Sequence, residues 1–298
     1  MNSKIFITGS SGFVGINLVK YLNPIYNIEK YLKNSRIKID HEIVIHLAGK
    51  AHDLKNVTSS AEYYDVNTDL TKKIYDAFIA SSAKVFIIMS SVKAVADEVD
   101  DILTEEAFPK PITHYGKSKL LAEKYILSKI VPEGKRVYIL RPCMIHGPGN
   151  KGNLNLLYKI VSKGIPWPLG SFENKRSFCS IDNILFIIGE LISRDDIPSG
   201  IYNVADDEAL STNEVISLLS KSQNRKPKIW ILPKGLLKIF AKFGDFFKLP
   251  LTTERLQKLT ESYVVSNQKI KSAIGKSLQV TAQDGLLITF NSFHTNDK

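Results

Sequence analysis

The stretch "KIFITGSSGFVGINLVKYL" (Lys4–Leu22) decides which fold we expect for this chain. Its first part, Lys4–Ser10, is rich in β-branched and aromatic residues and ends in a glycine turn, as a buried strand does. Its second part, Gly12–Leu22, has apolar residues at helical spacing and stops at an Asn-Pro pair. The stretch therefore predicts a strand, a tight turn and a helix in direct succession.

Three glycines, Gly9, Gly12 and Gly15, lie at this junction in a GxxGxxG spacing. A tight turn there directs backbone N–H groups and the positive end of the helix at a diphosphate, and glycine lets the backbone approach it closely. Such a triplet also occurs in turns that bind nothing. Because this one occupies the first strand–helix junction of an alternating α/β chain, we expect a dinucleotide as the ligand.

Further apolar, β-rich segments alternate with helical ones along the first two thirds of the chain. We expect strands over Glu42–Gly49, Lys84–Ser91, Arg136–Pro142 and Gly200–Asp206, and a long helix over Ala61–Ala83. Alternation of this kind is typical of a parallel sheet with helices on both faces. The predicted fold class is α/β, a Rossmann-like doubly wound parallel sheet.

From about residue 147 the elements become shorter and Gly/Pro turns more frequent, but no internal repeat or low-complexity linker separates two halves. We therefore expect interleaved parts. Residues 1–150 form the dinucleotide-binding domain, and 178–205 return to it. Residues 151–177 and 206–298 form a smaller mixed α/β region that binds substrate.

The composition is that of an ordinary soluble protein, with 44% hydrophobic and 23% charged residues among 298. Cys143 and Cys179 provide neither a disulfide framework nor a metal-ligand spacing, which fits a reducing compartment. We find no signal-peptide pattern and no stretch of about 18 apolar residues that would span a bilayer. We expect a cytoplasmic protein without a transmembrane segment and without a metal.

The formal net charge of +10 is compatible with nucleic acid, an anionic membrane surface or a small anionic ligand. The lysines are scattered and no RNA-binding aromatic signature is present, so nucleic acid is not the expected partner. One concentrated stretch, "PKGLLKIFAKFGDFFKLP" (Pro233–Pro250), reads as a basic amphipathic helix. Such a helix can lie on a membrane. We favour the alternative, a surface helix whose apolar side packs on the core.

The pentapeptide "YGKSK" places Tyr115 and Lys119 four residues apart. On a helix these two side chains share one face. A nearby cation lowers a tyrosine pKa from its usual value of about 10, and such a tyrosine can exchange a proton with a hydroxyl or carbonyl near neutral pH. The same spacing also arises when a packed ring lies beside a solvated charge, so further motifs have to decide.

Taken together, the motifs give a specific resemblance. The sequence resembles the extended short-chain dehydrogenase/reductases that act on nucleotide sugars. The motifs concerned are "TGSSGFVG" (Thr8–Gly15), "HLAG" (His46–Gly49), "VNTDLT" (Val66–Thr71), "MSSVK" (Met89–Lys93), "HYGKSK" (His114–Lys119), "LRP" (Leu140–Pro142), "HGPG" (His146–Gly149), "SFCSIDN" (Ser177–Asn183) and "YNVADDEALS" (Tyr202–Ser211). They cover nearly the whole chain.

The resemblance implies a Rossmann-type domain that binds NAD or NADP, and a C-terminal region that closes over a nucleoside-diphosphate sugar, with a UDP-hexose expected. By position, Tyr115 is the acid/base, and Lys119 lowers its pKa and holds the nicotinamide ribose. Ser91 orients the sugar oxygen, with Ser90 as the alternative. His46 and His114 are expected to be structural.

The resemblance also implies binding residues. Asn67 supports the catalytic groups. The substrate-binding residues are Ser91, which orients the sugar oxygen, and Asn153 and Arg176, which contact the sugar diphosphate, although Arg176 is equally well an ordinary surface charge. The expected cofactor-binding residues are Gly9, Ser11, Gly12, Phe13, Val14, Gly15, Leu47, Ala48, Gly49, Asn67, Tyr115, Lys119 and Pro142.

The implied reaction moves hydride between the nicotinamide and C4 of the hexose. Reduction of the rotated 4-ketone on its other face gives a 4-epimerase, and a single reduction of a ketone from solution gives a 4-ketoreductase. Dehydration is not expected, because Val92 and Lys93 replace the Asp-Glu pair of 4,6-dehydratases. By analogy we expect a role in bacterial surface polysaccharide synthesis and a possible homodimer. A non-catalytic sensor of dinucleotides or nucleotide sugars is the alternative.

One segment departs from the resemblance. Only about twenty residues separate the first helix from Glu42, where relatives have two strands and a helix. Glu29, Lys30 and Arg36 lie there, but none follows a convincing strand, so no residue that reads the adenosine ribose is identified. We expect a shortened second-strand region, a sheet without one edge strand, and leave NAD versus NADP undecided.

Overall fold

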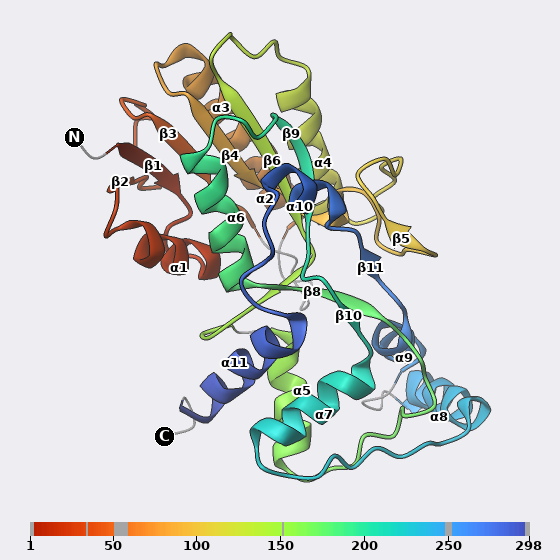
Figure 1. Cartoon of the computed structure of the whole chain (residues 1–298). Helices are drawn as coiled ribbons and strands as arrows, with labels where there is room; N and C mark the ends of the chain where they lie inside the picture. The colour runs from red at the N-terminus through yellow and green to blue at the C-terminus, as the bar shows by residue number, and fades with distance from the viewer. Residues whose placement is uncertain (1–2, 34, 51–58, 151, 248–251, 296–298) are drawn as a thin grey trace.

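A computed structural model describes residues 3–33, 35–50, 59–150, 152–247 and 252–295. Its largest element is a six-stranded, wholly parallel sheet in the order β2-β1-β3-β4-β6-β9 (Figure 1). The strands are β1 (Lys4–Thr8), β2 (Asn27–Lys30), β3 (Ile43–His46), β4 (Val85–Met89), β6 (Arg136–Pro142) and β9 (Gly200–Val204). The five strands predicted from the sequence are all present.

Helices cover both faces of this sheet, so the predicted doubly wound fold is confirmed. Apolar side chains of α1 (Phe13–Leu22) and α6 (Ile181–Ser193) pack against one face. Those of α3 (Leu70–Ala80) and α4 (His114–Leu127) pack against the other. Because both faces are covered, every residue of β3 and of β4 is buried, which explains their continuous apolar sequences.

The long helix predicted over residues 61–83 is interrupted. It consists of α2 (Ser60–Tyr64), a π-helical turn (Asp65–Asp69) and α3. The wider turn contains Asn67, whose carbonyl accepts a hydrogen bond from the hydroxyl of Thr71 at 2.8 Å. Turns of this type are frequent at functional sites, and this one places Asn67 in the candidate site described below.

The segment between α1 and β3 contains a strand that the sequence pattern does not reveal. Strand β2 pairs in parallel with β1 at the edge of the sheet, and Glu29 and Lys30 are part of it. Of its four residues only Ile28 is partly buried, so no alternation marks it in the sequence. This one strand is the only element that the described residues contain between α1 and β3, and the region is shortened as expected.

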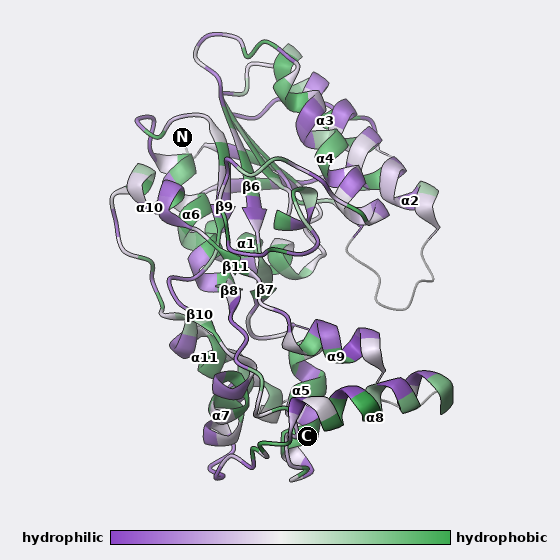
Figure 2. Ribbon diagram, turned by 90° about the vertical axis from the view of Figure 1, so that its right-hand side faces the viewer, coloured by the Kyte–Doolittle hydropathy of each residue, from purple (hydrophilic) through white to green (hydrophobic). Residues whose placement is uncertain are grey.

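The remaining elements lie outside the main sheet, and most of them surround an apolar core of their own at the lower end of the molecule in Figures 1 and 2. The strands are β7 (Met144–His146), β8 (Arg176–Ser180) and β10 (Ala209–Leu210) in one small sheet, and β5 (Ile102–Leu103) and β11 (Val264–Val265) in another. The helices are α5 (Asn153–Ser162), α7 (Thr212–Ser222), α8 (Lys234–Phe247), α9 (Thr253–Thr260) and α11 (Ala282–Thr295). Helix α10 (Gln268–Ile274) packs on the core of the main sheet.

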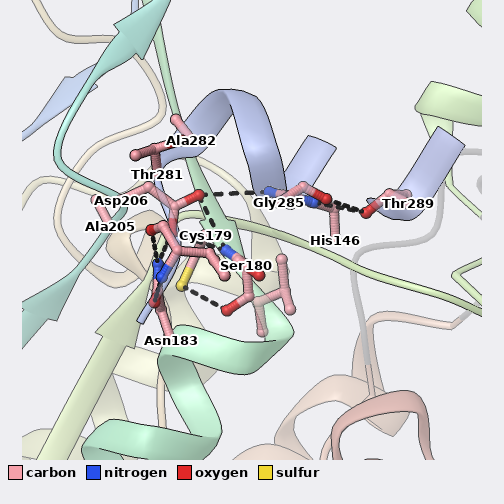
Figure 3. A network of polar contacts seen from close by, with 12 residues as sticks. His146, Cys179, Ser180, Asn183, Ala205, Asp206, Thr281, Ala282, Gly285 and Thr289 are labelled. Carbon is pink, nitrogen blue, oxygen red and sulfur yellow. Dashed lines mark hydrogen bonds and ion pairs between the residues drawn. The ribbon is translucent and has the colours of Figure 1, made fainter. Parts of the chain in front are cut away.

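A buried polar network joins the two regions (Figure 3). Asp206, just after β9, accepts hydrogen bonds from the backbone N–H of Ser180 at 2.9 Å and from the amide of Asn183 at 2.7 Å. Its other oxygen lies 3.4 Å from Nε2 of His146, whose Nδ1 is 2.9 Å from the hydroxyl of Thr289 on α11. Buried polar groups with partners fix one arrangement, so this network sets how the small sheet sits on the main one.

Candidate active site

The predicted site residues gather at the carboxyl edge of the main sheet. Thr8 at the end of β1 lies opposite His46 at the end of β3, because the strands are parallel and in register. The chain leaves β1 toward β2 on one side, and β3 lies on the other, so the strand order reverses between them. Ligands of open α/β sheets bind at such a switch point. Gly9 follows β1 and Leu47 follows β3 at this place.

The glycine turn has a geometry that only glycine permits at two positions. Gly9 has φ of 71°, and a Cβ there would lie 2.5 Å from the backbone nitrogen of Ala48. A Cβ on Gly15 would lie 2.2 Å from the carbonyl oxygen of Gly9. Gly12, by contrast, has φ of −76° and room for a Cβ. The first and third glycines are therefore required by the turn, and Gly12 leaves space on the exposed side.

The start of α1 fits an anionic group. Gly12 is the N-cap, no side chain of the described residues caps it, and no acidic residue lies in the first turn. Ser11 and Gly12 are exposed, while Phe13 and Val14 are partly buried. Uncapped N–H groups at a helix start bind phosphate. The residues predicted to bind the cofactor diphosphate are thus suited to it.

The pair Tyr115 and Lys119 lies on the first two turns of α4, as predicted. Thr113 caps this helix, and its hydroxyl accepts a hydrogen bond from the Gly116 N–H at 3.1 Å. The hydroxyl of Tyr115 forms a side-chain hydrogen bond with Ser91, which follows β4. Burial raises the pKa of Tyr115, and the bond with Ser91 opposes this only in part. Tyr115 therefore keeps its proton at neutral pH.

Lys119 is buried, and its side chain reaches the end of β4. Its buried ammonium group donates to the carbonyl of Met89 at 2.8 Å, and burial lowers its pKa to about 8 against the opposing effect of Glu123. Burial, not Lys119, is the main influence on the pKa of Tyr115 in this arrangement, and the role of Lys119 as the group that lowers that pKa stays a prediction.

The choice between the two serines after β4 follows from their partners. The hydroxyl of Ser90 donates to Glu123, which forms a buried ion pair with Arg141 at 2.6 Å. Both charged side chains are at most 3% exposed. Ser90 is therefore engaged in this buried group, and the geometry favours Ser91 as the serine that acts with Tyr115.

Asn67 and Gly49 keep the floor of the site in place. Oδ1 of Asn67 accepts from the Lys50 N–H at 2.8 Å, and its amide donates to the Lys50 carbonyl and to the hydroxyl of Ser118. A Cβ on Gly49 would lie 2.9 Å from Nζ of Lys119 and 3.1 Å from Oδ1 of Asn67. Gly49 thus lets the loop after β3 approach both side chains, consistent with the supporting role expected for Asn67.

His46 has a structural position. The Thr71 hydroxyl already donates to the Asn67 carbonyl, so it accepts from Nε2 of His46 at 2.9 Å. Nδ1 then accepts from the hydroxyl of Thr8 at 2.6 Å. Burial lowers the pKa of His46 to about 3, so the ring is neutral. Neutral His46 ties the end of β1 to the end of β3 and to the π-helical turn.

Arg176 and Asn153, the residues predicted to contact the sugar diphosphate, belong to β8 and α5 outside the main sheet. Arg176 on β8 donates to the carbonyl of Lys258 at 2.9 Å and pairs with Glu261 at 3.2 Å, with its side chain 30% exposed. It is a partly buried, paired arginine. Asn153 begins α5, and its side chain lies outside the described residues. Pro142 is buried at the end of β6.

Three residues near the site were not identified from the sequence. The ring of Tyr63 meets that of Tyr115 edge-on, with centroids 6.2 Å apart. Nζ of Lys93 lies 4.2 Å from the ring centroid of Tyr263 and donates to the Asp97 carbonyl at 2.7 Å. Burial lowers the pKa of Lys93. Tyr263 is far away in the sequence, and no local pattern could have placed it here.

Metal-binding clusters and membrane-spanning helices are both absent from the described residues. None of their His, Cys, Asp and Glu side chains form a group of three or more that could hold a metal ion. None of their helices combines the length and apolarity needed to cross a membrane.

A doubly wound parallel sheet with a glycine turn at its switch point, and a Ser, Tyr and Lys at the same edge, defines a dinucleotide-binding Rossmann enzyme. The chain belongs to the NAD dependent epimerase/dehydratase family, whose sequence model matches residues 27–205. This identification agrees with the resemblance derived from the motifs.

Individual relatives are similar over nearly their full length. The chain is 31% identical to a UDP-glucose 4-epimerase of Vibrio cholerae, over 98% of this chain and 96% of that protein. It is 26% identical to an N-acetyl-alpha-D-glucosaminyl-diphospho-ditrans,octacis-undecaprenol 4-epimerase of Escherichia coli O157:H7, over 91% and 85%. Its fold matches the solved structure of MoeE5 in complex with UDP-glucose and NAD, with a TM-score of 0.76, 19% identity and coverage of 99% and 100%.

Proposed function

We propose that this protein transfers hydride at C4 of the hexose of a nucleoside-diphosphate sugar, using NAD or NADP. The observation that carries the proposal is the hydrogen bond between Tyr115 on α4 and Ser91 after β4, at the carboxyl edge of the main sheet. Membership of the NAD dependent epimerase/dehydratase family and the named activities of the two relatives support it. We further propose a UDP-hexose as the substrate, since the Vibrio cholerae relative is named for one.

A bound nicotinamide dinucleotide supplies the hydride acceptor and donor in this chemistry. The glycine turn and the start of α1 would hold its diphosphate, and Lys119 and Asn67 are the proposed contacts of its nicotinamide half. Ser91 positions the C4 oxygen of the sugar beside Tyr115. Because burial keeps the pKa of Tyr115 raised, its hydroxyl is ready to donate a proton to the oxygen of a 4-ketone.

The reverse half-reaction requires Tyr115 to accept the proton of a C4 hydroxyl. The hydrogen bond from Ser91 favours the phenolate form and so assists this step. Lys119, whose pKa is about 8, is the second group able to stabilise that charge if its ammonium turns from the Met89 carbonyl. An epimerase uses both half-reactions and a 4-ketoreductase uses one, and the same side chains serve either outcome.

The two relatives carry their sugars on different groups. The name of the Escherichia coli protein places the diphosphate on undecaprenol, and that of the Vibrio cholerae protein on uridine. Both substrates present a hexose and a diphosphate, for which Arg176 and Asn153 are the proposed contacts. We commit to the nucleotide sugar, because similarity is higher to the UDP-glucose epimerase.

The decisive experiment incubates purified protein with UDP-hexoses and NAD, or with a UDP-4-keto-hexose and NADPH, and follows products by NMR. Tyr115→Phe should reduce kcat/KM by about 100-fold or more, since a general acid/base contributes that much. The matched control is Tyr125→Phe on the same helix, whose hydroxyl contacts Asp76 on α3 away from Ser91. Tyr125→Phe should keep its activity.

Folding of both variants is checked by circular dichroism. A Tyr115→Phe protein that is folded and fully active would refute the role of Tyr115. Calorimetry that detects nucleotide-sugar binding without turnover across the substrate panel would instead favour the non-catalytic sensor.

A further inference from the structure

Helix α8 carries a stripe of large apolar side chains that the rest of the described chain leaves exposed. The residues recur at i, i+3, i+4, i+7, i+10 and i+11, so they lie along one face of the helix. They are Leu236 (41% exposed), Ile239 (53%), Phe240 (54%), Phe243 (55%), Phe246 (81%) and Phe247 (60%). This differs from the favoured sequence interpretation, in which the apolar side of this helix packs on the core.

A different and narrower face of α8 packs against the rest of the protein. Leu237, Ala241 and Gly244 are buried, and they follow the spacing i, i+4 and i+7. Leu237 and Ala241 belong to the apolar core of the C-terminal region. The helix is therefore anchored by small and medium residues, while its largest apolar residues point elsewhere.

The exposed aromatic residues form a continuous patch. The rings of Phe243 and Phe247 are stacked with centroids 6.4 Å apart, and those of Phe246 and Phe247 meet edge-on at 4.9 Å. Single exposed apolar residues are common on soluble proteins, but a contiguous patch marks a contact surface. In Figures 1 and 2, α8 lies at the outer end of the C-terminal region, where a large flat partner could reach it.

The charges on α8 indicate what that partner is. Lys234, Lys238 and Lys242 are exposed and lie along a further side of the helix, at i, i+4 and i+8. The only carboxylate of α8, Asp245, accepts hydrogen bonds from the backbone N–H and the hydroxyl of Thr253, and thereby joins α8 to α9. The apolar stripe is thus accompanied by positive charge.

We propose that α8 docks the protein on an anionic phospholipid bilayer. An interfacial helix has a large apolar face and a lysine-rich polar side, and it lies in the plane of the membrane. The phenylalanines enter the boundary between head groups and acyl chains, and the lysines meet lipid phosphates. With 14 residues, α8 is about 21 Å long, too short to cross the hydrocarbon core.

The position of α8 connects this surface to the candidate substrate site. Asp245 of α8 binds Thr253 at the start of α9, and the Lys258 carbonyl near the end of α9 accepts from Arg176. Arg176 is the proposed diphosphate contact. Docking through α8 therefore brings the substrate-binding end of the molecule, rather than the open edge at β2, toward the membrane.

The test is co-sedimentation of the full chain with phosphatidylcholine vesicles, with and without phosphatidylglycerol. Wild-type protein should bind the anionic vesicles, and high salt should weaken the binding. The variant Phe243→Ser/Phe246→Ser/Phe247→Ser should lower the partition coefficient by about tenfold or more. A second variant, Lys238→Glu/Lys242→Glu, should lose the preference for anionic lipid.

A matched control tests whether the loss of any exposed apolar side chains would weaken vesicle binding. Phe108, Ile112 and Ile130 are 78%, 72% and 92% exposed and lie in loops outside α8. Changing all three to serine removes a comparable apolar surface and should leave vesicle binding unchanged. Thermal unfolding and turnover of a soluble UDP-hexose are measured in parallel, so that loss of docking is distinguished from loss of fold or of the proposed activity.

Three outcomes would overturn the proposal. The first is wild-type protein that remains in the supernatant with both kinds of vesicle. The second is equal loss of binding in the loop control and the α8 variant. The third is a wild-type dimer, seen by light scattering, that the α8 variant converts to monomer without any vesicle binding, which would assign the patch to a second copy of the chain.

Discussion

The carboxyl edge of the main sheet and the α8–α9 surface place similar side chains in opposite surroundings. At the edge, Glu123 and Arg141 are buried and pair with each other, and His46 is enclosed between two threonines. On α9, Glu254 and Lys258 form a pair whose side chains are 75% and 61% exposed. Buried polar groups tolerate one geometry, whereas exposed groups tolerate many. The first region is suited to hold reacting atoms in a fixed geometry. The second is suited to bind a lipid surface, which requires no fixed side-chain geometry.

The largest contrast is expected between the two ion pairs. Arg141→Met leaves the Glu123 carboxylate buried with Ser90 as its remaining polar partner, which should cost about 3–5 kcal/mol of unfolding free energy. Lys258→Met on the exposed surface should cost about 0.5 kcal/mol or less. Urea unfolding of the two variants measures both values.

The double variant Glu123→Leu/Arg141→Met sharpens this comparison. Replacing both charges removes the unpaired carboxylate, so it should recover most of the stability lost in Arg141→Met. If Arg141→Met and Lys258→Met were equally mild, the distinction between the two regions would be wrong.

A pair of glycines gives the next contrast. Gly9→Ala at the edge forces an alanine to φ of 71° and its Cβ to 2.5 Å from the Ala48 nitrogen, which should cost about 2–4 kcal/mol. Gly235→Ala in the first turn of α8 meets no atom within 4 Å and should stabilise the helix by about 0.5 kcal/mol. Thermal unfolding reports both changes, and titration with NAD should show weaker binding for Gly9→Ala only.

The smallest expected effect is a loss of unfolding free energy as the pH falls. The pKa of His46 is lowered to about 3 in the fold, while an unfolded histidine titrates near 6.5, so between these values the unfolded chain binds the extra proton. Stability therefore falls as the pH drops below about 6.5. For this one group the loss between pH 7 and pH 5 is about 2 kcal/mol.

The variant His46→Gln cannot titrate at this position. Unfolding free energy is measured against pH for the wild type and for this variant, and the difference between the two slopes gives the contribution of His46. His114→Gln is the control, since His114 is exposed at the start of α4 and contacts Tyr64. A wild-type slope equal to that of His46→Gln would contradict the assignment of His46 as a buried, neutral group.

Much of the fold was predictable because its signals are local. Strand β4 is apolar at every position, and the glycine turn with the helix that follows it is recognisable within a short window. Parallel strands end at one edge, so residues that follow different strands could be expected to meet. The family resemblance had assigned Gly9, Gly49, Ser91 and Tyr115 to one site, and in the structure they follow β1, β3 and β4 or lie on α4.

Other features depend on contacts between distant segments. Strand β2 was missed because an exposed edge strand has no alternating pattern. Ser90 follows β4, Glu123 is on α4 and Arg141 is on β6, so the hydrogen bond and the ion pair that join them form only when these three elements pack together. The packing of Lys93 against Tyr263 joins residues far apart in the chain.

The sequence by itself determined the alternation of the main strands and helices, the glycine turn after the first strand, and the side chains available for chemistry. These properties follow from periodicity, backbone sterics and the identity of functional groups, which are local. Only the tertiary structure decided that desolvation raises the pKa of Tyr115, that Lys119 faces a carbonyl, and that α8 exposes its phenylalanines. Burial and electrostatic surroundings are created by the whole fold, and a short stretch of sequence does not contain them.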